Sequence, residues 1–430
     1  MTIRYKAQSD REDLRPVSGI LFSGLLLVFW LEYARPGTYF PILDTLKLSL
    51  IVPVAVFALT LLSSDGRPHS APLKAPDTKW WLLLVCLFLV QFVTAPVRLY
   101  VYETLRGVVG YLLVYYVIIR QVESLRRLKA VMGTLVLVHV LVILLYPDVV
   151  LNPDTRHYLG GTFLGDGNDF AWSACIAMPF ALFLAYSSDS TFRKVAFYGI
   201  FVLLILAVIG TQSRGASLAI GVAMLYLVMK SRRKALALAV VGMLVALVLL
   251  FAPEAYFDRM SSIMDYETEG SAQGRILAWK TATSMALDHP LTGVWAGHFG
   301  VMFGFKYKPA DYIGPYLNAH SIYFVMLGEF GFPGLLTLLG LIIGNVVRNE
   351  RVIRNLRSSR PPGDATNLSL MVAMQTALLG YAVGGMFLSG VFYPHLFVLT
   401  GLMQSARLIA AGDGAGSRDA SAKVATIPRT

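Results

Sequence analysis

The hydrophobic positions of this 430-residue chain fall in long uninterrupted runs. Residues 201–209 and 241–251, for example, contain no charged side chain. A helix needs about 20 predominantly apolar residues to cross the hydrocarbon core of a bilayer. The sequence therefore predicts an all-α polytopic membrane protein with about twelve transmembrane helices. The predicted spans are 17–34, 43–62, 80–97, 103–119, 129–146, 169–186, 195–211, 214–229, 235–252, 319–346, 368–389 and 393–410.

Composition supports the same class. Hydrophobic residues make up 56% of the chain and charged residues 15%, and the mean hydropathy is +0.61. A typical soluble domain has roughly 25% charged residues. These values exclude a disordered chain and argue against a water-soluble protein, because a core of this size could not bury so much apolar surface. The chain contains neither a CxxC nor an HExxH motif, so no metal site is predicted.

The formal net charge is +11, which in a soluble protein would suggest nucleic acid as a partner. In a membrane protein, the positions of the cations must be considered first. Alternation of the twelve spans places 26 of the 37 lysines and arginines on one side of the membrane. Loops rich in these residues face the cytoplasm. We therefore expect both termini to be cytoplasmic and no nucleic-acid partner. The cation-rich segments are 1–17, 63–79, 120–129, 187–195, 230–234, 347–367 and 407–430.

One loop is much longer than the others, and the same alternation places it in the periplasm. The predicted organisation is helices 1–9 in residues 1–251, this loop in 252–318, helices 10–12 in 319–410 and a disordered cytoplasmic tail in 411–430. Long ordered loops are usually functional. Within the loop, residues 273–287 are predicted to form an amphipathic helix at the membrane surface. Its expected apolar face consists of Ile276, Trp279, Thr283 and Ala286.

Two outer arginines occupy unusual positions. Arg214 follows a short polar break and begins a predicted span. It fits two interpretations: a side chain that reaches the membrane interface, or an anion site beside a helix N-terminus. Arg275 lies in the first turn of the predicted loop helix, where its charge opposes the helix dipole. Both are therefore candidates for binding an anionic group.

His320 is the titratable group whose position most suggests chemistry. It lies where the long loop meets a span, and Asn318 is the predicted N-cap of that span. The positive end of the helix dipole would keep the imidazole neutral near pH 7, as a general base requires. A histidine that is merely hydrogen-bonded at the interface fits the position equally well. His139, in the middle of a span, is interpreted as structural.

Other polar residues have structural interpretations. Glu329 lies on roughly the opposite face of the helix from His320, so packing against a partner helix is preferred over a catalytic dyad. Gly331 and Pro333 predict a kink in that span. Asp166 is interpreted as part of a helix cap in preference to a calcium loop, because the distal glutamate is missing. Glu103 and Arg106 are expected to pair.

Together, these residues resemble the bacterial O-antigen ligases of the O-antigen ligase and polymerase superfamily. The resemblance rests on four segments in order, and motif-bearing sequence covers about residues 205–340. The usual asparagine after the loop histidine is here Ser321. The four segments are Ser213-Arg214-Gly215, the run from Gly274-Arg275 to Trp279, the run from His289-Pro290 to Gly297, and Ala319-His320-Ser321 leading into Gly328-Glu329-Phe330-Gly331.

The resemblance implies a membrane glycosyltransferase of the C-type fold in the bacterial inner membrane, with its active site facing the periplasm. Such an enzyme would transfer a polysaccharide from undecaprenyl pyrophosphate to lipid A–core, without a metal or other cofactor. Arg214 and Arg275 would hold the pyrophosphate, and His320 would deprotonate or orient the acceptor hydroxyl. Without an obvious carboxylate nucleophile, direct displacement with inversion is expected.

Three other functions remain open at this stage. The first two are a polymerase that joins repeat units and a ligase that glycosylates protein or another glycan; both would share the donor chemistry and the motifs. The third, a transporter or flippase, would be expected to carry charged residues deep in several spans. Here the candidate groups gather at outer helix ends and in one loop, which favours chemistry at the membrane surface.

Overall fold

The computed structural model describes residues 16–152, 166–261, 270–358 and 364–425. These parts of the chain are predominantly helical and contain no β-strand. Each of the predicted spans coincides with a helix. Those helices are α2 (Pro16–Phe29) continued by η1 (Trp30–Ala34), α4 (Leu48–Leu62), α6 (Thr78–Thr94), α7 (Arg98–Gln121), α8 (Leu125–Leu145), α10 (Gly167–Tyr186), α11 (Thr191–Gly210), α12 (Arg214–Lys230), α13 (Lys234–Phe251), α17 (Ile322–Ser358), α18 (Asp364–Gly384) and α19 (His395–Ala425).

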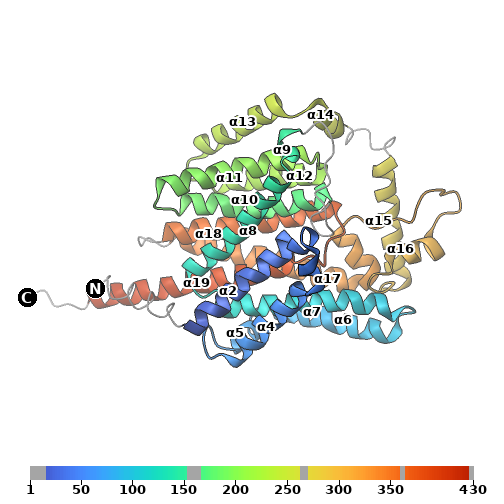
Figure 1. Cartoon of the computed structure of the whole chain (residues 1–430), viewed down its shortest axis with the longest axis horizontal. Coiled ribbons are helices and arrows are strands. Elements are labelled where there is room, and N and C mark those ends of the chain that lie inside the picture. The colour runs from blue at the N-terminus through green and yellow to red at the C-terminus, as the bar shows by residue number, and fades with distance from the viewer. Residues whose placement is uncertain (1–15, 153–165, 262–269, 359–363, 426–430) are drawn as a thin grey trace, which may run out of the picture.

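Short helices connect these long ones. They are η2 (Pro36–Thr38), α3 (Pro41–Thr45), α5 (Ser70–Leu73), α9 (Asp148–Leu151), α14 (Glu254–Ser261), α16 (Phe299–Met302), η3 (Phe303–Tyr307) and η4 (Gly385–Phe387). The long loop contributes one more substantial helix, α15 (Gly270–Asp288). In Figure 1, α15 and α16 lie beyond the ends of the bundle helices, at the right-hand side.

Six helices of the described chain are long and apolar enough to cross a membrane. They are α7, α8, α10, α11, α17 and the segment Ala365–Phe387. Four further apolar helical segments are shorter, among them α4 and α6. The chain is therefore an all-helical, polytopic membrane protein, and the full set of twelve crossings stays a prediction.

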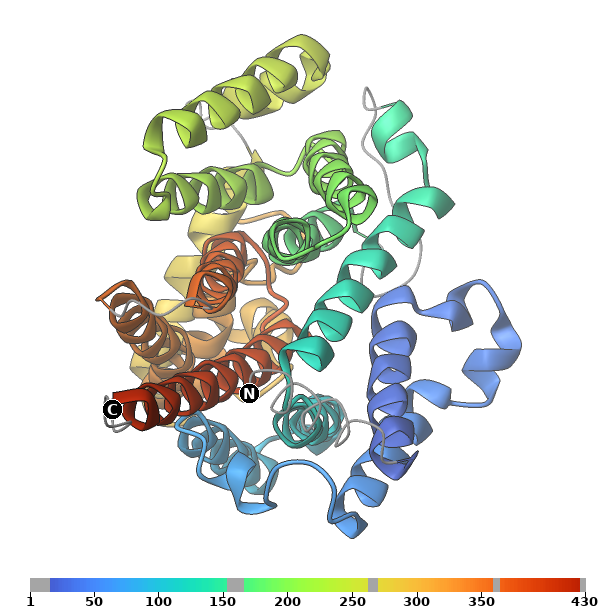
Figure 2. The ribbon, with the colours of Figure 1, turned by 90° about the vertical axis from the view of Figure 1, so that its left-hand side faces the viewer.

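The bundle is organised around α10, which packs against α8, α11, α12 and α18. Its Trp172 is fully buried and stacks on Tyr381 of α18 with 4.9 Å between ring centroids. The indole N–H also donates to the carbonyl of Tyr381 at 3.0 Å. Figure 2, which views the bundle from the left-hand end of Figure 1, shows α13 at the edge, where it packs against α12.

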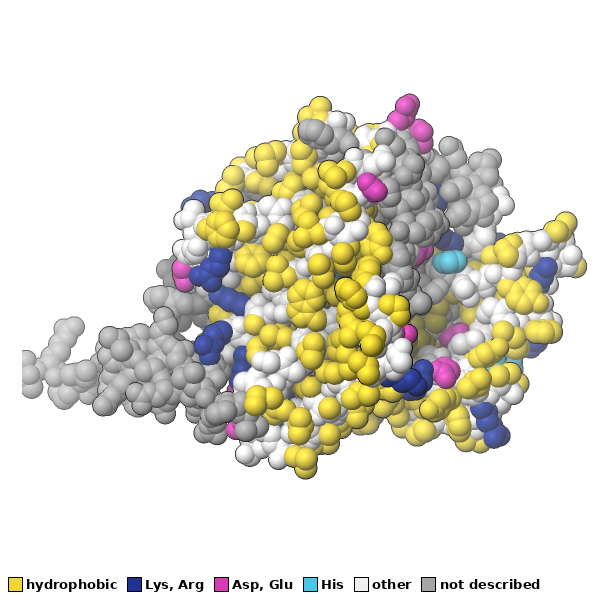
Figure 3. Space-filling model, in the orientation of Figure 1, with side chains coloured by type: hydrophobic (Ala, Val, Ile, Leu, Met, Phe, Trp, Pro, Cys, Tyr) yellow, Lys and Arg dark blue, Asp and Glu magenta, His cyan; other side chains and the backbone are white. Residues whose placement is uncertain are grey.

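The flank of the bundle exposes apolar side chains, as expected for a surface that faces lipid. Figure 3 shows them as a broad yellow area, with several Lys and Arg side chains at its left edge. We call this end, where α12 and α17 finish, the basic end. The opposite end, where α12 and α17 begin and α15 and α16 lie, is the loop end (Figure 1).

The loop helix forms where the sequence predicts it, and its buried face matches the prediction only in part. Ala278, Ala282 and Met285 are fully buried, and α15 packs against α17. Thr283, which was expected on the apolar face, is exposed. The prediction is therefore correct at Ala286, which is fully buried, and wrong at Thr283, because small alanine side chains allow close helix packing without a strong hydrophobic stripe.

The C-terminal helix is longer than expected. The sequence predicts a span that ends at residue 410 and a disordered tail over 411–430, whereas α19 continues to Ala425. Residues 426–430 lie outside the described part of the chain. The helical tail is compatible with the local sequence, because Ala411–Ala425 contains no proline to interrupt the backbone hydrogen bonds.

The kink predicted in α17 is confirmed. Gly331 has φ +64° and ψ −161°, which interrupts the helix, and Pro333 follows. A positive φ of this kind suits glycine because it has no Cβ atom. The interruption leaves backbone groups at the loop end of α17 available for hydrogen bonds with other segments.

Candidate functional site

His320 lies two residues before the start of α17, at the loop end. Its backbone is left-handed, with φ +46°, and the residue is exposed. Helix α17 begins at Ile322, so the prediction that Asn318 is its N-cap was wrong. His320 therefore lies before the first turn of the helix. The buried Ser321 accepts the amide of Val325 through its carbonyl at 2.9 Å. The left-handed residue thus turns the loop sharply into the helix.

The turn that carries His320 is held by α15. The indole N–H of Trp279 donates to the carbonyl of Ala319 at 2.9 Å. The same indole stacks on Phe324 of α17, with centroids 5.0 Å apart and an interplanar angle of 9°. Trp279 therefore fixes both the residue before His320 and the helix after it. Arg275 lies four residues before Trp279, and residues at this spacing share one face of a helix.

The positive charge of Arg275 acts on His320. Desolvation of the ring and the positive charge of Arg275 lower the pKa of His320 from its ordinary value of 6.5, while the charge of Asp166 acts in the opposite direction. Both lowering effects disfavour the imidazolium form. Both effects therefore favour the neutral form of the ring, and they arise from partial desolvation and a neighbouring cation in place of the helix dipole.

Asp166 joins this site from a third element. Its carboxylate accepts the backbone N–H of Asn168 at 3.0 Å, so it is the N-cap of α10, as the sequence predicts. Its influence on His320, which sequence reasoning missed, places the N-terminus of α10 near the histidine. The same aspartate thus has a structural partner and a candidate functional neighbour.

Arg214 is the first residue of α12, after the buried polar break Thr211-Gln212-Ser213. It is not among the groups that shift the pKa of His320. Helix η4 nevertheless packs against the first turns of both α12 and α17. A Cβ atom on Gly215 would lie 3.0 Å from the ring of Phe387, and one on Gly385 would lie 2.5 Å from Ile322. The helix starts next to Arg214 and His320 therefore share η4 as a neighbour.

These helix starts are suited to bind an anion. Amide groups in the first turn of a helix point outward without helical partners, and the helix dipole adds positive potential there. The starts of α12 and α17, the guanidinium of Arg275 and the one of Arg214 all belong to the loop end. A guanidinium can form two parallel hydrogen bonds to phosphate oxygens. The loop end therefore combines groups suited to bind phosphate with a histidine whose lowered pKa favours the neutral ring.

As predicted, Glu329 forms no dyad with His320. Its role is nevertheless more specific than the predicted packing against a partner helix. The side chain is buried, and its carboxylate accepts the backbone N–H of Phe299 at 3.1 Å. Phe299 begins α16 in the loop. No periodicity in the sequence indicates such a contact between a span and a loop 30 residues away.

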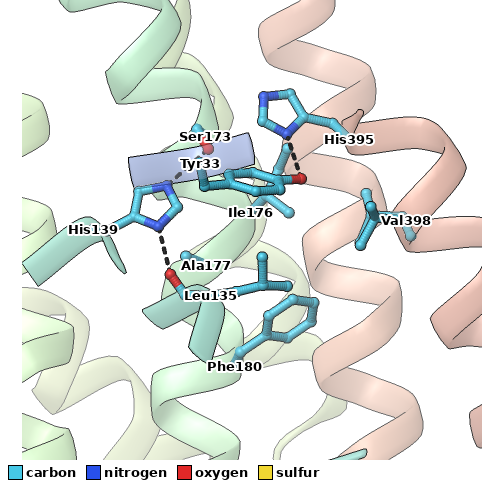
Figure 4. A pocket seen from close by; sticks show the side chains of 10 residues that line it. Tyr33, Leu135, His139, Ser173, Ile176, Ala177, Phe180, His395 and Val398 are labelled. Carbon is cyan, nitrogen blue, oxygen red and sulfur yellow. Dashed lines mark hydrogen bonds between the residues drawn. The ribbon is translucent and has the colours of Figure 1, made fainter. Parts of the chain in front are cut away.

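The interpretation of His139 as structural agrees with its surroundings (Figure 4). Its Nδ1 lies 2.7 Å from the carbonyl of Leu135, and its Nε2 lies 2.7 Å from the hydroxyl of Ser173. The ring borders a small cavity between η1, α8, α10 and α19, which Tyr33 and His395 also line. The cavity has room for about one water molecule. It is too small for a glycan.

One predicted ion pair lies outside this site. Glu103 and Arg106 form the predicted ion pair, with 2.6 Å between oxygen and nitrogen. Within the described ranges, His, Cys, Asp and Glu side chains form no group of three or more that could hold a metal ion. The candidate site therefore consists of Arg214, Arg275 and His320, with Asp166 nearby.

The fold and the candidate site define a polytopic membrane protein with basic groups and a neutral histidine at one end of its bundle. Residues 199–339 match the family model of the O-antigen ligases, and this match supports the resemblance to the O-antigen ligase and polymerase superfamily. The matched segment includes the three candidate site residues. No curated protein matches the chain. Enzymes of this family are glycosyltransferase-like ligases or polymerases that use a lipid-linked glycan.

Proposed function

We propose that the protein is an O-antigen ligase of the bacterial inner membrane. It transfers a polysaccharide from undecaprenyl pyrophosphate to a sugar hydroxyl of lipid A–core at the periplasmic face. Both termini are cytoplasmic, so that the loop end faces the periplasm and the basic end the cytoplasm, consistent with the cation bias. The observation that carries the proposal is the proximity of Arg275 to His320 beside the start of α17.

The donor pyrophosphate binds at the loop end. Arg214 and Arg275 hold its oxygens, and the first-turn amides of α12 add hydrogen-bond donors. As the bond between the anomeric carbon and the pyrophosphate oxygen breaks, negative charge develops on the leaving group. Cations placed in advance stabilise that charge most when it is largest, in the transition state. The two arginines thereby lower the barrier without a metal ion.

His320 acts on the acceptor. Its neutral ring takes the proton of the acceptor hydroxyl as the oxygen forms its bond to the anomeric carbon. The proton passes to the histidine, and undecaprenyl pyrophosphate leaves with the bonding electrons. One direct displacement inverts the configuration at the anomeric carbon. Because Arg275 and partial desolvation lower the pKa of His320, a larger fraction of the base is available at mildly acidic pH than for an ordinary histidine.

A reconstituted transfer assay tests this proposal. Purified protein in lipid nanodiscs receives an undecaprenyl-pyrophosphate-linked glycan and, separately, lipid A–core, a second lipid-linked glycan or a serine-rich peptide. We expect glycan transfer to lipid A–core, with inverted anomeric configuration and no loss of activity in EDTA. Product formed only on the second lipid-linked glycan would make the protein a polymerase, and product formed only on peptide would make it a protein ligase. Either result would overturn the ligase assignment.

A further inference from the structure

The loop segment after α15 lies along the interruption of α17. The amide of Val294 donates to the carbonyl of Gly328 at 2.9 Å, and the amide of Phe332 donates to the carbonyl of Pro290 at 2.9 Å. These two bonds lie on either side of Gly331. The interruption of the helix therefore provides backbone partners for the loop, and two segments of the family resemblance join at this point.

Gln91 of α6 joins both segments. Its Nε2 donates to the carbonyls of Thr292 at 2.8 Å and Glu329 at 2.7 Å. Its Oε1 accepts the amide of Ala296 at 3.0 Å. The side chain is only 1% exposed, so each of these bonds replaces a contact with water that is no longer available. One buried amide thus connects α6, the loop and α17.

Glu329 extends the same connection toward α16. Its carboxylate accepts the amide of Phe299 at 3.1 Å and also a backbone hydrogen bond from Gly297. The side chain is 6% exposed. Two backbone donors converging on one buried carboxylate fix the loop at the first residue of α16. This role requires hydrogen-bond acceptance and does not require a proton to move.

From α16 the contacts lead to the residues before His320. A Cβ atom on Gly300 would lie 3.2 Å from Oδ1 of Asn318 and 3.7 Å from the carbonyl of Leu317. The start of α16 therefore lies against the chain two residues before His320. Trp279 holds the following residue, Ala319, from the side of α15. The left-handed turn at His320 is supported from both sides.

We propose that Glu329 and Gln91 are positioning residues for the transfer reaction, acting on His320 through α16 and Asn318. This inference rests on the proposed function, because it assigns a role relative to the proposed base. Glu329 works as a hydrogen-bond acceptor and Gln91 as a backbone connector, and neither touches the substrates. Their loss displaces His320 from the acceptor hydroxyl while leaving the pyrophosphate-binding arginines in place.

Two substitutions at Glu329 separate this role from proton transfer. Glu329→Gln keeps a carbonyl oxygen that can accept the loop amides, whereas Glu329→Ala removes the acceptor. A misplacement of about 1 Å can cost on the order of 100-fold in rate. We expect Glu329→Ala to lower kcat about 10- to 100-fold with little change in KM for the lipid-linked donor. Glu329→Gln should keep at least about a third of the wild-type kcat.

Hydrogen–deuterium exchange provides a readout independent of turnover. In Glu329→Ala, residues 296–320 should exchange faster than in the wild type, while α10 exchanges at the wild-type rate. Gln91→Leu, similar in size, should give the same pattern of exchange and kinetics, and it serves as the test if Glu329→Ala does not fold. Wild-type kcat in Glu329→Ala, or in Gln91→Leu, would overturn the inference.

The outcomes distinguish this inference from the proposed function. If Glu329→Gln is as inactive as Glu329→Ala although its loop is protected normally, the carboxylate itself takes part in chemistry and the positioning role is wrong. If both Glu329 variants are fully active while His320→Ala is inactive, the positioning role fails but the proposed function stands. An active His320→Ala would instead remove the proposed function.

Discussion

The two ends of the helix bundle use arginine differently. At the basic end, the buried Asp77 accepts a hydrogen bond from Asn345 at 3.0 Å and contacts Arg348 and Arg407. These residues belong to α17 and α19, so one carboxylate connects three helices. At the loop end, the charge of Arg275 acts on His320, a group that can itself become positive.

This difference separates structural from functional charge. A cation next to a buried carboxylate is neutralised, and the pair holds helices in register. A cation next to a histidine raises the free energy of the imidazolium form, so the pair adds no stability when the ring is protonated. Such an arrangement is useful where a neutral base and an anion-binding cation are needed together. Perturbed histidines beside cations are accordingly candidates for functional sites.

The largest expected effect comes from removing the proposed base at the loop end. His320→Ala should reduce transfer by about 10²- to 10⁴-fold, the usual contribution of general acid–base catalysis. Because His320 is exposed, we expect the substitution to leave the fold intact. Initial rates of purified protein, compared at saturating donor and acceptor, measure the loss. A variant within about threefold of the wild type would contradict the role of His320.

A smaller effect is expected when the charge of Arg214 is kept but its geometry is changed. Arg214→Lys removes the paired hydrogen bonds of the guanidinium to phosphate oxygens, so kcat/KM for the lipid-linked donor should fall about tenfold. The matched control is Arg106→Lys, which alters an exposed arginine paired with Glu103. We expect the control to stay within about twofold of the wild type. Equal behaviour of the two variants would remove Arg214 from the site.

At the basic end, a substitution should affect stability and leave the specific activity of the folded protein nearly unchanged. Asp77→Asn leaves Arg348 and Arg407 without their carboxylate, and breaking a buried ion pair costs about 3–5 kcal/mol. The midpoint of thermal unfolding in detergent should therefore fall, while kcat of the folded fraction changes by less than about twofold. A selective loss of kcat with an unchanged midpoint would contradict the contrast between the two ends.

The sequence was sufficient to locate the helices because each apolar run is long and is bounded by polar residues. The kink at Gly331, the cap at Asp166 and the pair of Glu103 with Arg106 could also be predicted, since each depends on neighbouring residues. The packed face of α15 could be predicted only in part, because it depends on alanines that fit closely against α17. Side-chain hydrophobicity does not report such closeness.

The candidate site was predictable in part for the same reason. Arg214, Arg275 and His320 stand out in their local segments, but only the fold shows that Arg275 and Asp166 act on His320. Gln91 contacts a residue 238 positions away, and no local pattern indicates such a bond. Contacts of this kind follow from how the loop and the interrupted helix meet.

The proposed mechanism requires that Arg275 keep His320 neutral as the base of the transfer reaction. The most direct test is the pH dependence of kcat for the wild type, Arg275→Lys and Arg275→Gln. Because the positive charge lowers the pKa of His320, its removal raises that pKa, and activity should be lost at higher pH as the solution is acidified. We predict that the acidic midpoint moves to higher pH in Arg275→Gln and stays near the wild-type value in Arg275→Lys, whatever the absolute rates. An acidic midpoint that is unchanged in Arg275→Gln, or that moves to lower pH, would contradict the claim.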